Sequence, residues 1–162
     1  IIPIIISIIA TVIALISWGL SKNDFLLTHR PFVWVENFGY LNEQNILITP
    51  PKKVIIRVLH SPAQIISEEF SYFIMKNKEK EYIEKQNYKN FIRYPDDKIQ
   101  YINTSAKIID SLIDKLEEDQ ELRRFIRIQY KWLSSEKKYF FESEWRYDKK
   151  DKKWDTLYQK AN

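Results

Sequence analysis

The first 20 residues of the chain contain no charged side chain and no histidine. This run, IIPIIISIIATVIALISWGL, is dominated by isoleucine, and every Lys, Arg, Asp and Glu of the protein follows it. As an α-helix, a run of this length extends roughly 30 Å, which is the thickness of the hydrocarbon core of a bilayer. A helix that is apolar around its whole circumference has no face to give to water. The sequence therefore predicts a transmembrane helix over residues 1–20.

Both ends of this run agree with a spanning helix. Pro3 falls in the first turn, where its missing N–H does little harm, and an indole ring near the other end prefers the lipid headgroup region. The run is longer than the apolar region of a usual signal peptide and lacks a basic leader, so we expect it to be retained, with the lipid bilayer as a partner. Residues 21–29 are expected to form a polar linker. The predicted membrane-spanning side chains are Ile5, Ile9, Val12, Leu15, Ile16 and Trp18.

Residues 30–162 carry the signals of a mainly β domain. Apolar and polar residues alternate over residues 52–60, 63–74, 124–132 and 139–147, and prolines or polar turns separate these stretches. β-branched and aromatic residues also follow Pro31, which indicates a first strand. We expect residues 52–60 and 63–74 to pair as a hairpin. The mostly charged residues 76–90 are expected to leave the sheet as a solvated helix or a long connection.

The period of the pattern changes after position 104. Apolar residues from Ile108 to Leu116 recur at helical spacing behind Thr104 or Ser105 as N-cap, which predicts an amphipathic helix inserted over about residues 105–118. About six to eight short antiparallel strands with turns between them favour an antiparallel β-sandwich. Its predicted core residues recur at strand period, and they are Trp34, Val54, Ile56, Val58, Phe70, Ile128, Tyr130, Trp132, Phe141 and Trp145.

A short pattern adds to this interpretation. Residues 30–33 read Arg-Pro-Phe-Val, Glu36 follows, and a Pro-Ala pair at residues 62–63 comes after an apolar strand. The pattern resembles a broad group of uncharacterised prokaryotic single-pass membrane proteins, in which a membrane helix precedes an Arg-Pro-aromatic-Val strand and an immunoglobulin-like sandwich. In that group an Asn and a Gly usually precede Pro-Ala, whereas residues 59–61 here are Leu-His-Ser. The resemblance covers most of the chain and implies an anchor with an immunoglobulin-like sandwich, but no reaction.

The sequence contains no pattern that imposes a reaction. The chain has no cysteine, which excludes disulfides, thiolate nucleophiles and cysteine-based metal sites. Its two histidines, His29 and His60, lack the spacing of a metal-binding pair, and two glycines cannot form a phosphate-binding loop. We therefore expect no catalytic site, metal, cofactor or small-molecule substrate.

Two carboxylate pairs are the residues most compatible with acid–base chemistry or calcium binding. Asp96 and Asp97 follow a proline in a predicted turn, where Asp caps backbone N–H groups, and Glu142 and Glu144 share the wet face of a predicted strand. A structural role is therefore favoured for both pairs. Asn103 begins an Asn-Thr-Ser sequon, which can be glycosylated on an extracytoplasmic face.

The basic cluster at residues 149–153 and the net charge of +4 could attract nucleic acid or anionic lipid. The cluster reads Lys-Lys-Asp-Lys-Lys and has no interleaved stacking aromatics. A solvated hairpin tip is therefore favoured, and nucleic-acid recognition is not expected.

These observations favour a non-enzymatic, single-pass membrane protein whose sandwich lies in the extracytoplasmic space and contacts other protein subunits, as an accessory subunit of a larger membrane assembly. The alternative is a pilin-like filament subunit, whose N-terminal helix packs against copies of itself in a fibre core. Against the filament, the apolar run ends near Leu20 and has no acid near its start. An enzyme with an unrecognised site is a third hypothesis, which no residue pattern favours.

Overall fold

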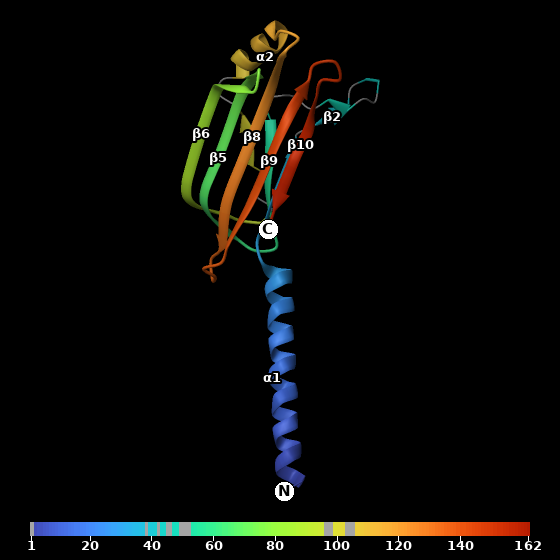
Figure 1. Ribbon diagram of the computed structural model, residues 1–162, viewed down its shortest axis with the longest axis vertical. Helices are drawn as coiled ribbons and strands as arrows, with labels where there is room; N and C mark the ends of the chain where they lie inside the picture. The colour runs from blue at the N-terminus through green and yellow to red at the C-terminus, as the bar shows by residue number, and fades with distance from the viewer. Residues whose placement is uncertain are drawn as a thin grey trace. The chain divides into compact units, whose positions relative to one another are not determined.

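A computed structural model of the protein describes residues 2–37, 39–41, 43–44, 47–48, 53–95, 99–102 and 106–162. The chain divides into two compact units, Ile1–Arg30 and Pro31–Asn162. The first unit is one apolar helix, and the second is built mainly of antiparallel strands (Figure 1).

Helix α1 runs over Ile2–His29 and is 28 residues long. The sequence predicted a linker at residues 21–29, and this prediction is wrong, because the helix continues through them. Local hydrogen bonds support the last turns: Thr28 Oγ1 donates to the Asp24 carbonyl at 2.6 Å, and His29 Nδ1 lies 3.0 Å from the Phe25 carbonyl oxygen. The helix ends before Pro31 because a proline disfavours helical backbone at the residue that precedes it.

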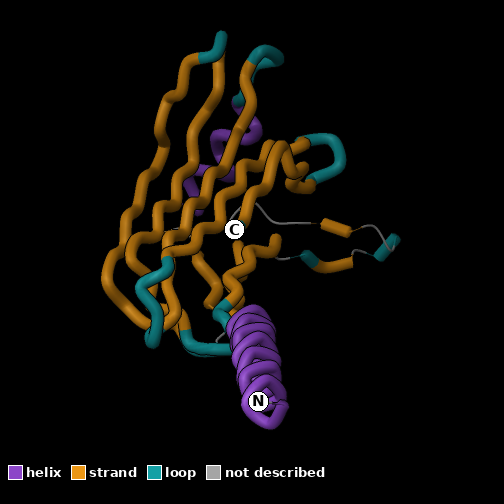
Figure 2. Tube along the Cα trace, turned by 60° about the horizontal axis from the view of Figure 1, so that its bottom comes forward, coloured by secondary structure: helices purple, strands orange, loops and turns teal. Residues whose placement is uncertain are grey.

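Two antiparallel sheets form most of the second unit. The longer sheet has the strand order β10-β9-β8-β5-β6, and its strands run side by side (Figures 1 and 2). They are β5 (Ala63–Lys76), β6 (Glu79–Arg93), β8 (Gln120–Trp132), β9 (Lys138–Asp148) and β10 (Lys153–Ala161). The shorter sheet has the order β1-β4-β7, with β1 (Phe32–Asn37), β4 (Lys53–Leu59) and β7 (Ile99–Ile102). A further pair joins β2 (Tyr40–Leu41) to β3 (Leu47–Ile48).

The expected hairpin of residues 52–60 with 63–74 does not form. β4 pairs with β1 and β7, whereas β5 pairs with β6 and β8, so these consecutive strands belong to different sheets. The chain changes sheet at a tight corner in which His60 has a φ of 71° and the Ser61 N–H donates to the Leu59 carbonyl at 3.0 Å. Pro62 follows the corner and lacks an N–H to continue the ladder.

The charged segment at residues 76–90 is also part of the sheet, contrary to the sequence prediction. Residues 79–93 form the long edge strand β6, which pairs with β5 along its length. Charged side chains are compatible with this position because most of the strand is exposed, and Lys residues on an edge oppose indiscriminate pairing with other chains. The polarity of this segment therefore predicted its exposure correctly, but the predicted backbone conformation was wrong.

One hydrophobic core joins residues of the two sheets and of helix α2 (Ala106–Lys115). The inserted helix was thus predicted at the right place, and its Ile109 is fully buried. Of the predicted core residues, Trp34 and Trp132 are only partly buried. Trp34 packs edge-on against Phe141, with ring centroids 5.9 Å apart. The other predicted core residues are buried, namely Val54, Ile56, Val58, Phe70, Ile128, Tyr130, Phe141 and Trp145.

Candidate functional site

Helix α1 presents large apolar side chains to its surroundings. None of the 19-residue stretch Ser7–Phe25 is buried, and the stretch is long and apolar enough to span a membrane. A signal sequence near an N-terminus meets the same criterion. The side chain of Ile5 lies outside the described part of the structure, although its backbone is helical. The other predicted spanning residues are 49% to 65% exposed: Ile9, Val12, Leu15, Ile16 and Trp18.

The end of α1 carries a stripe of aromatic and basic side chains. Trp18, Lys22, Phe25 and His29 are spaced by four, three and four positions, so they lie on one helix face. The Lys22 ammonium lies 5.2 Å from the centroid of the Trp18 ring, and the rings of Phe25 and His29 stack at 4.1 Å. We call these four residues the α1 stripe. Trp18 lies well inside the helix, eleven residues before its end.

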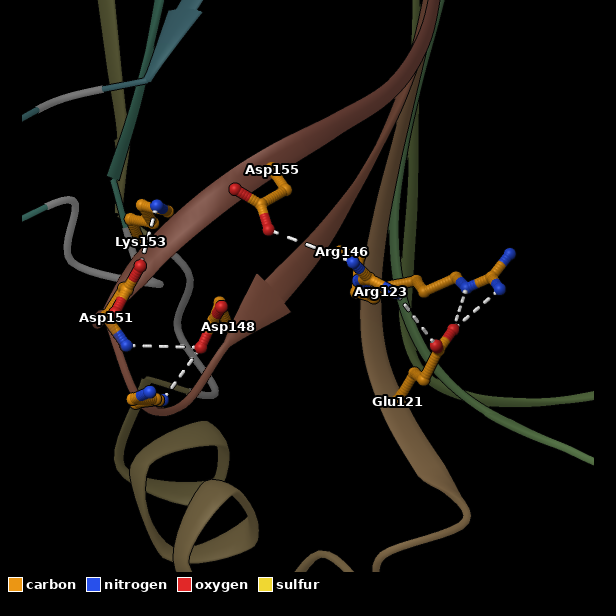
Figure 3. A network of polar contacts seen from close by, with 8 residues as sticks. Glu121, Arg123, Arg146, Asp148, Asp151, Lys153 and Asp155 are labelled. Atoms are coloured by element: carbon orange, nitrogen blue, oxygen red, sulfur yellow. Dashed lines mark hydrogen bonds and ion pairs between the residues drawn. The ribbon is translucent and has the colours of Figure 1, made fainter.

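The outer face of the longer sheet carries a network of ion pairs (Figure 3). Arg123 bonds Glu121 at 2.6 Å and Glu144 at 2.8 Å, and Arg146 lies 3.3 Å from Glu121 and 3.9 Å from Asp155. The hydrogen bond from Arg123 lowers the pKa of Glu121. Alternating charges therefore bridge β8, β9 and β10 across the sheet.

The predicted carboxylates Glu142 and Glu144 lie in this layer of charges. Glu144 is only 7% exposed and bonds Arg123, with Lys80 at 4.0 Å. Glu142 accepts hydrogen bonds from Arg127 Nε at 2.6 Å and from the Tyr158 hydroxyl at 3.1 Å. Burial and the charge of Glu142 raise the pKa of Tyr158 to about 12. Each carboxylate is thus paired with an arginine of the neighbouring strand β8.

The other predicted candidates are not brought together. His29 ends α1, and His60 lies at the exposed corner after β4. Asp96, Asp97 and Asn103 lie outside the described residues. Among the residues that the structure does describe, no group of three or more His, Cys, Asp or Glu side chains could hold a metal ion.

The basic cluster lies at the turn between β9 and β10, as the sequence predicted: residues 149–152 form the turn and Lys153 begins β10. Asp148 Oδ1 accepts the backbone N–H groups of Lys150 and Asp151 at 2.8 and 3.1 Å (Figure 3). Lys153 bonds Asp151 at 2.8 Å, and this pairing lowers the pKa of Asp151. The acids of this turn therefore offset part of its positive charge.

Exposed tyrosines mark the edge strand β6. Tyr82 is 51% exposed and Tyr88 is 42% exposed, while Tyr94 follows the strand end and is also exposed. Lys85 lies 5.5 Å from the centroid of the Tyr82 ring. Because tyrosine is enriched at protein interfaces, this edge is a candidate contact surface.

The predictions from sequence did not include two buried arginines. Arg93 bonds Glu68 at 2.6 Å, and both side chains are 1% exposed. Arg124 is fully buried, lies between the rings of Trp145 and Trp154 and donates to Asn37 Oδ1. The sequence does contain a signal for their burial. Glu68 lies two residues before Phe70 and Arg124 two residues before Ile126, so each charged residue shares a strand face with a buried apolar residue.

No family model, curated protein sequence or solved structure matches the chain.

Proposed function

We propose that this protein is a non-enzymatic, membrane-anchored interaction module, in which α1 spans the bilayer and the β unit binds other protein subunits of a membrane assembly. The observation that carries the proposal is the unburied apolar stretch Ser7–Phe25. Helices of this kind need an apolar environment, which lipid supplies.

The charges of the β unit support binding in preference to catalysis. A catalytic site needs convergent titratable groups whose pKa values suit proton transfer. Here Glu121, Glu142 and Glu144 each bond an arginine of their own sheet. In this arrangement the carboxylates stabilise the sheet surface, and other side chains contact the partner subunits.

We assign recognition to the edge of β6. Its exposed tyrosines offer the aromatic contact area from which interfaces draw much of their affinity, and its charged residues supply a polar rim. In the same proposal, the two antiparallel sheets are an immunoglobulin-like sandwich that lies in the extracytoplasmic space. The single shared core supports the sandwich.

Co-purification of the native complex tests this function. We expect Tyr82→Ala combined with Tyr88→Ala to release partner subunits from the detergent-solubilised chain. Leu157→Ala is the matched control, because Leu157 is 40% exposed on the opposite edge strand, β10, and should retain the partners. Single alanine changes at His29, His60, Asp96, Asp97, Glu142 or Glu144 should also retain them.

Three outcomes would contradict the proposal. If the tyrosine variant retained every partner, β6 would not be the contact surface. If one of the six single variants abolished a measurable turnover while its partners stayed bound, the protein would be an enzyme. Isolation of a fibre containing only this chain would favour the pilin-like alternative.

Orientation can be tested separately because the chain has no cysteine. A single cysteine in the exposed turn at residues 149–152, for example Lys150→Cys, should react with a membrane-impermeant maleimide in intact cells. Labelling only after the cells are lysed would place the β unit on the cytoplasmic side.

A further inference from the structure

Helix α1 is longer than the hydrocarbon core of a bilayer requires. Its 28 residues extend about 42 Å at 1.5 Å per residue, against about 30 Å of hydrocarbon. The first charged residues, Lys22 and Asp24, lie in the last third of the helix. If the apolar run fills the hydrocarbon core, as the proposed function requires, the following turns of the same helix lie at the level of the lipid headgroups.

In these turns the charges of opposite sign lie on different faces. Lys22 belongs to the α1 stripe, in which it covers the Trp18 ring at 5.2 Å. Asp24 follows Lys22 by two positions, which places it nearly on the opposite side of a helix with 3.6 residues per turn. It shares that side with Ser21 and Thr28, and Thr28 bonds its backbone carbonyl. The α1 stripe therefore combines a cation with aromatic rings and no carboxylate.

This combination suits a phospholipid headgroup. Trp rings prefer the boundary between hydrocarbon and headgroups, and a lysine ammonium extends from that boundary toward phosphate. Trp18 lies at the end of the apolar run and is 65% exposed, so an acyl chain can contact its ring. Free phosphate offers the charge but not the apolar contact.

We propose that the α1 stripe is a binding site for an anionic phospholipid, in which Lys22 contacts the phosphate while Trp18 contacts the upper part of the acyl chains. The site rests on the proposed function, because it exists only if α1 spans a bilayer. It deepens that function by naming the class of lipid that surrounds the anchor.

Lipid selectivity of the full chain tests the site. The chain is reconstituted in phosphatidylcholine vesicles that contain a trace of spin-labelled phosphatidylglycerol or, separately, spin-labelled phosphatidylcholine. Electron paramagnetic resonance then measures the fraction of each labelled lipid that the protein immobilises. One lysine near the surface favours anionic lipid by about fivefold, which corresponds to about 1 kcal/mol, and we expect a preference of that size. The variant Lys22→Gln should reduce the preference to about one, while Lys149→Gln, on the turn before β10, should leave it unchanged.

The possible outcomes separate this site from the anchor itself. An inserted chain that has no preference for phosphatidylglycerol, or that keeps the preference in Lys22→Gln, overturns the headgroup site alone. Loss of the preference in Lys149→Gln, or its abolition by excess inorganic phosphate at constant ionic strength, also overturns it. If alkaline carbonate extracts the wild-type chain from the vesicles, α1 is not a membrane anchor. The Lys22→Gln variant must itself resist this extraction, because only an inserted variant can show that Lys22 causes the lipid preference.

Discussion

At the scale of single residues, buried charge is the main departure from an apolar core. The Arg124 guanidinium lies 4.6 Å from the Trp145 ring and 4.4 Å from the Trp154 ring, and burial lowers its pKa. Two aromatic faces and the hydrogen bond to Asn37 offset part of the cost of removing this cation from water. Because Asn37 ends β1, the contact ties the shorter sheet to the longer one. We therefore expect Arg124 to contribute more to the specificity of this arrangement than to its stability.

Truncation of Arg124 should therefore lower the free energy of unfolding more than its replacement by a side chain of similar volume. Arg124→Ala opens a cavity between the two Trp rings and should lower the free energy of unfolding by about 2–5 kcal/mol. Arg124→Met keeps most of the volume and should lie within about 1.5 kcal/mol of wild type. Urea denaturation of the detergent-solubilised chain measures both free energies of unfolding. The control is Arg127→Ala on the outer face, which should lower the free energy of unfolding by about 1 kcal/mol or less. Equal losses for Met and Ala would show that charge, and not packing, governs this position.

The Glu68–Arg93 pair predicts an unusual pH dependence. Burial raises the pKa of Glu68 above its ordinary value of 4.5, and Arg93 only partly opposes this shift. The folded state therefore binds the proton more tightly than the unfolded state, and the stability contribution of Glu68 is lost as the pH rises from about 4.5 through the folded pKa. We expect the difference in unfolding free energy, wild type minus Glu68→Gln, to fall over that range.

Glu121→Gln is the matched control for this experiment, because hydrogen bonding to Arg123 lowers the pKa of Glu121. Its contribution is present above pH 4.5 and is lost as the pH falls through the folded pKa, so the difference should have the opposite slope. Parallel slopes for the two variants, measured by denaturation between about pH 3 and 7, would contradict the assignment for Glu68.

At the scale of elements, periodicity predicted the strands with a buried face and the inserted helix. The alternation around Ile128 and Phe141 predicted the strands β8 and β9, and the helical spacing around Ile109 predicted the helix α2. The edge strand β6 could not be found in this way, because its backbone pairing with β5 does not depend on apolar side chains. Sheet membership of β4 and β5 also escaped prediction, since sequence order favours a hairpin and only the corner at His60 redirects the chain.

Only part of the candidate site could be predicted from the sequence. The apolar run indicated the spanning side chains. The alternation of β9 predicted that Glu142 and Glu144 share a wet face, but Glu144 is buried. The ion pairs that hold these two carboxylates depend on register with β8 and β10, which no local pattern encodes. The α1 stripe was missed because residues 21–29 were expected to be a linker, and without the helix Lys22 and Trp18 share no face.

The spanning role of α1 predicts a strong position dependence for a new charge. Leu15→Arg or Ile9→Arg should weaken membrane insertion by about 2.5–3.5 kcal/mol, because the guanidinium would lie within the hydrocarbon. Asn23→Arg, in the charged end of the same helix, should insert like wild type. An insertion assay that returned equal efficiencies for all three variants would contradict a helix that spans at this depth.

At the scale of the whole molecule, the chain combines two units that need different environments. The Ile1–Arg30 unit is an apolar helix, whereas the Pro31–Asn162 unit has its own core and a surface of ion pairs. Because the second unit has a buried hydrophobic core of its own, we expect it to be soluble when α1 is absent. We therefore expect membrane attachment to depend on the helix alone.

Alkaline carbonate extraction of the full chain, compared with residues 31–162 expressed alone, measures this dependence. The full chain should remain in the membrane pellet, because its helix is held by hydrophobic burial that carbonate does not disrupt, and the truncated chain should be recovered in the supernatant as a folded monomer. Recovery of the full chain as a soluble monomer without detergent would show that α1 is not a membrane anchor.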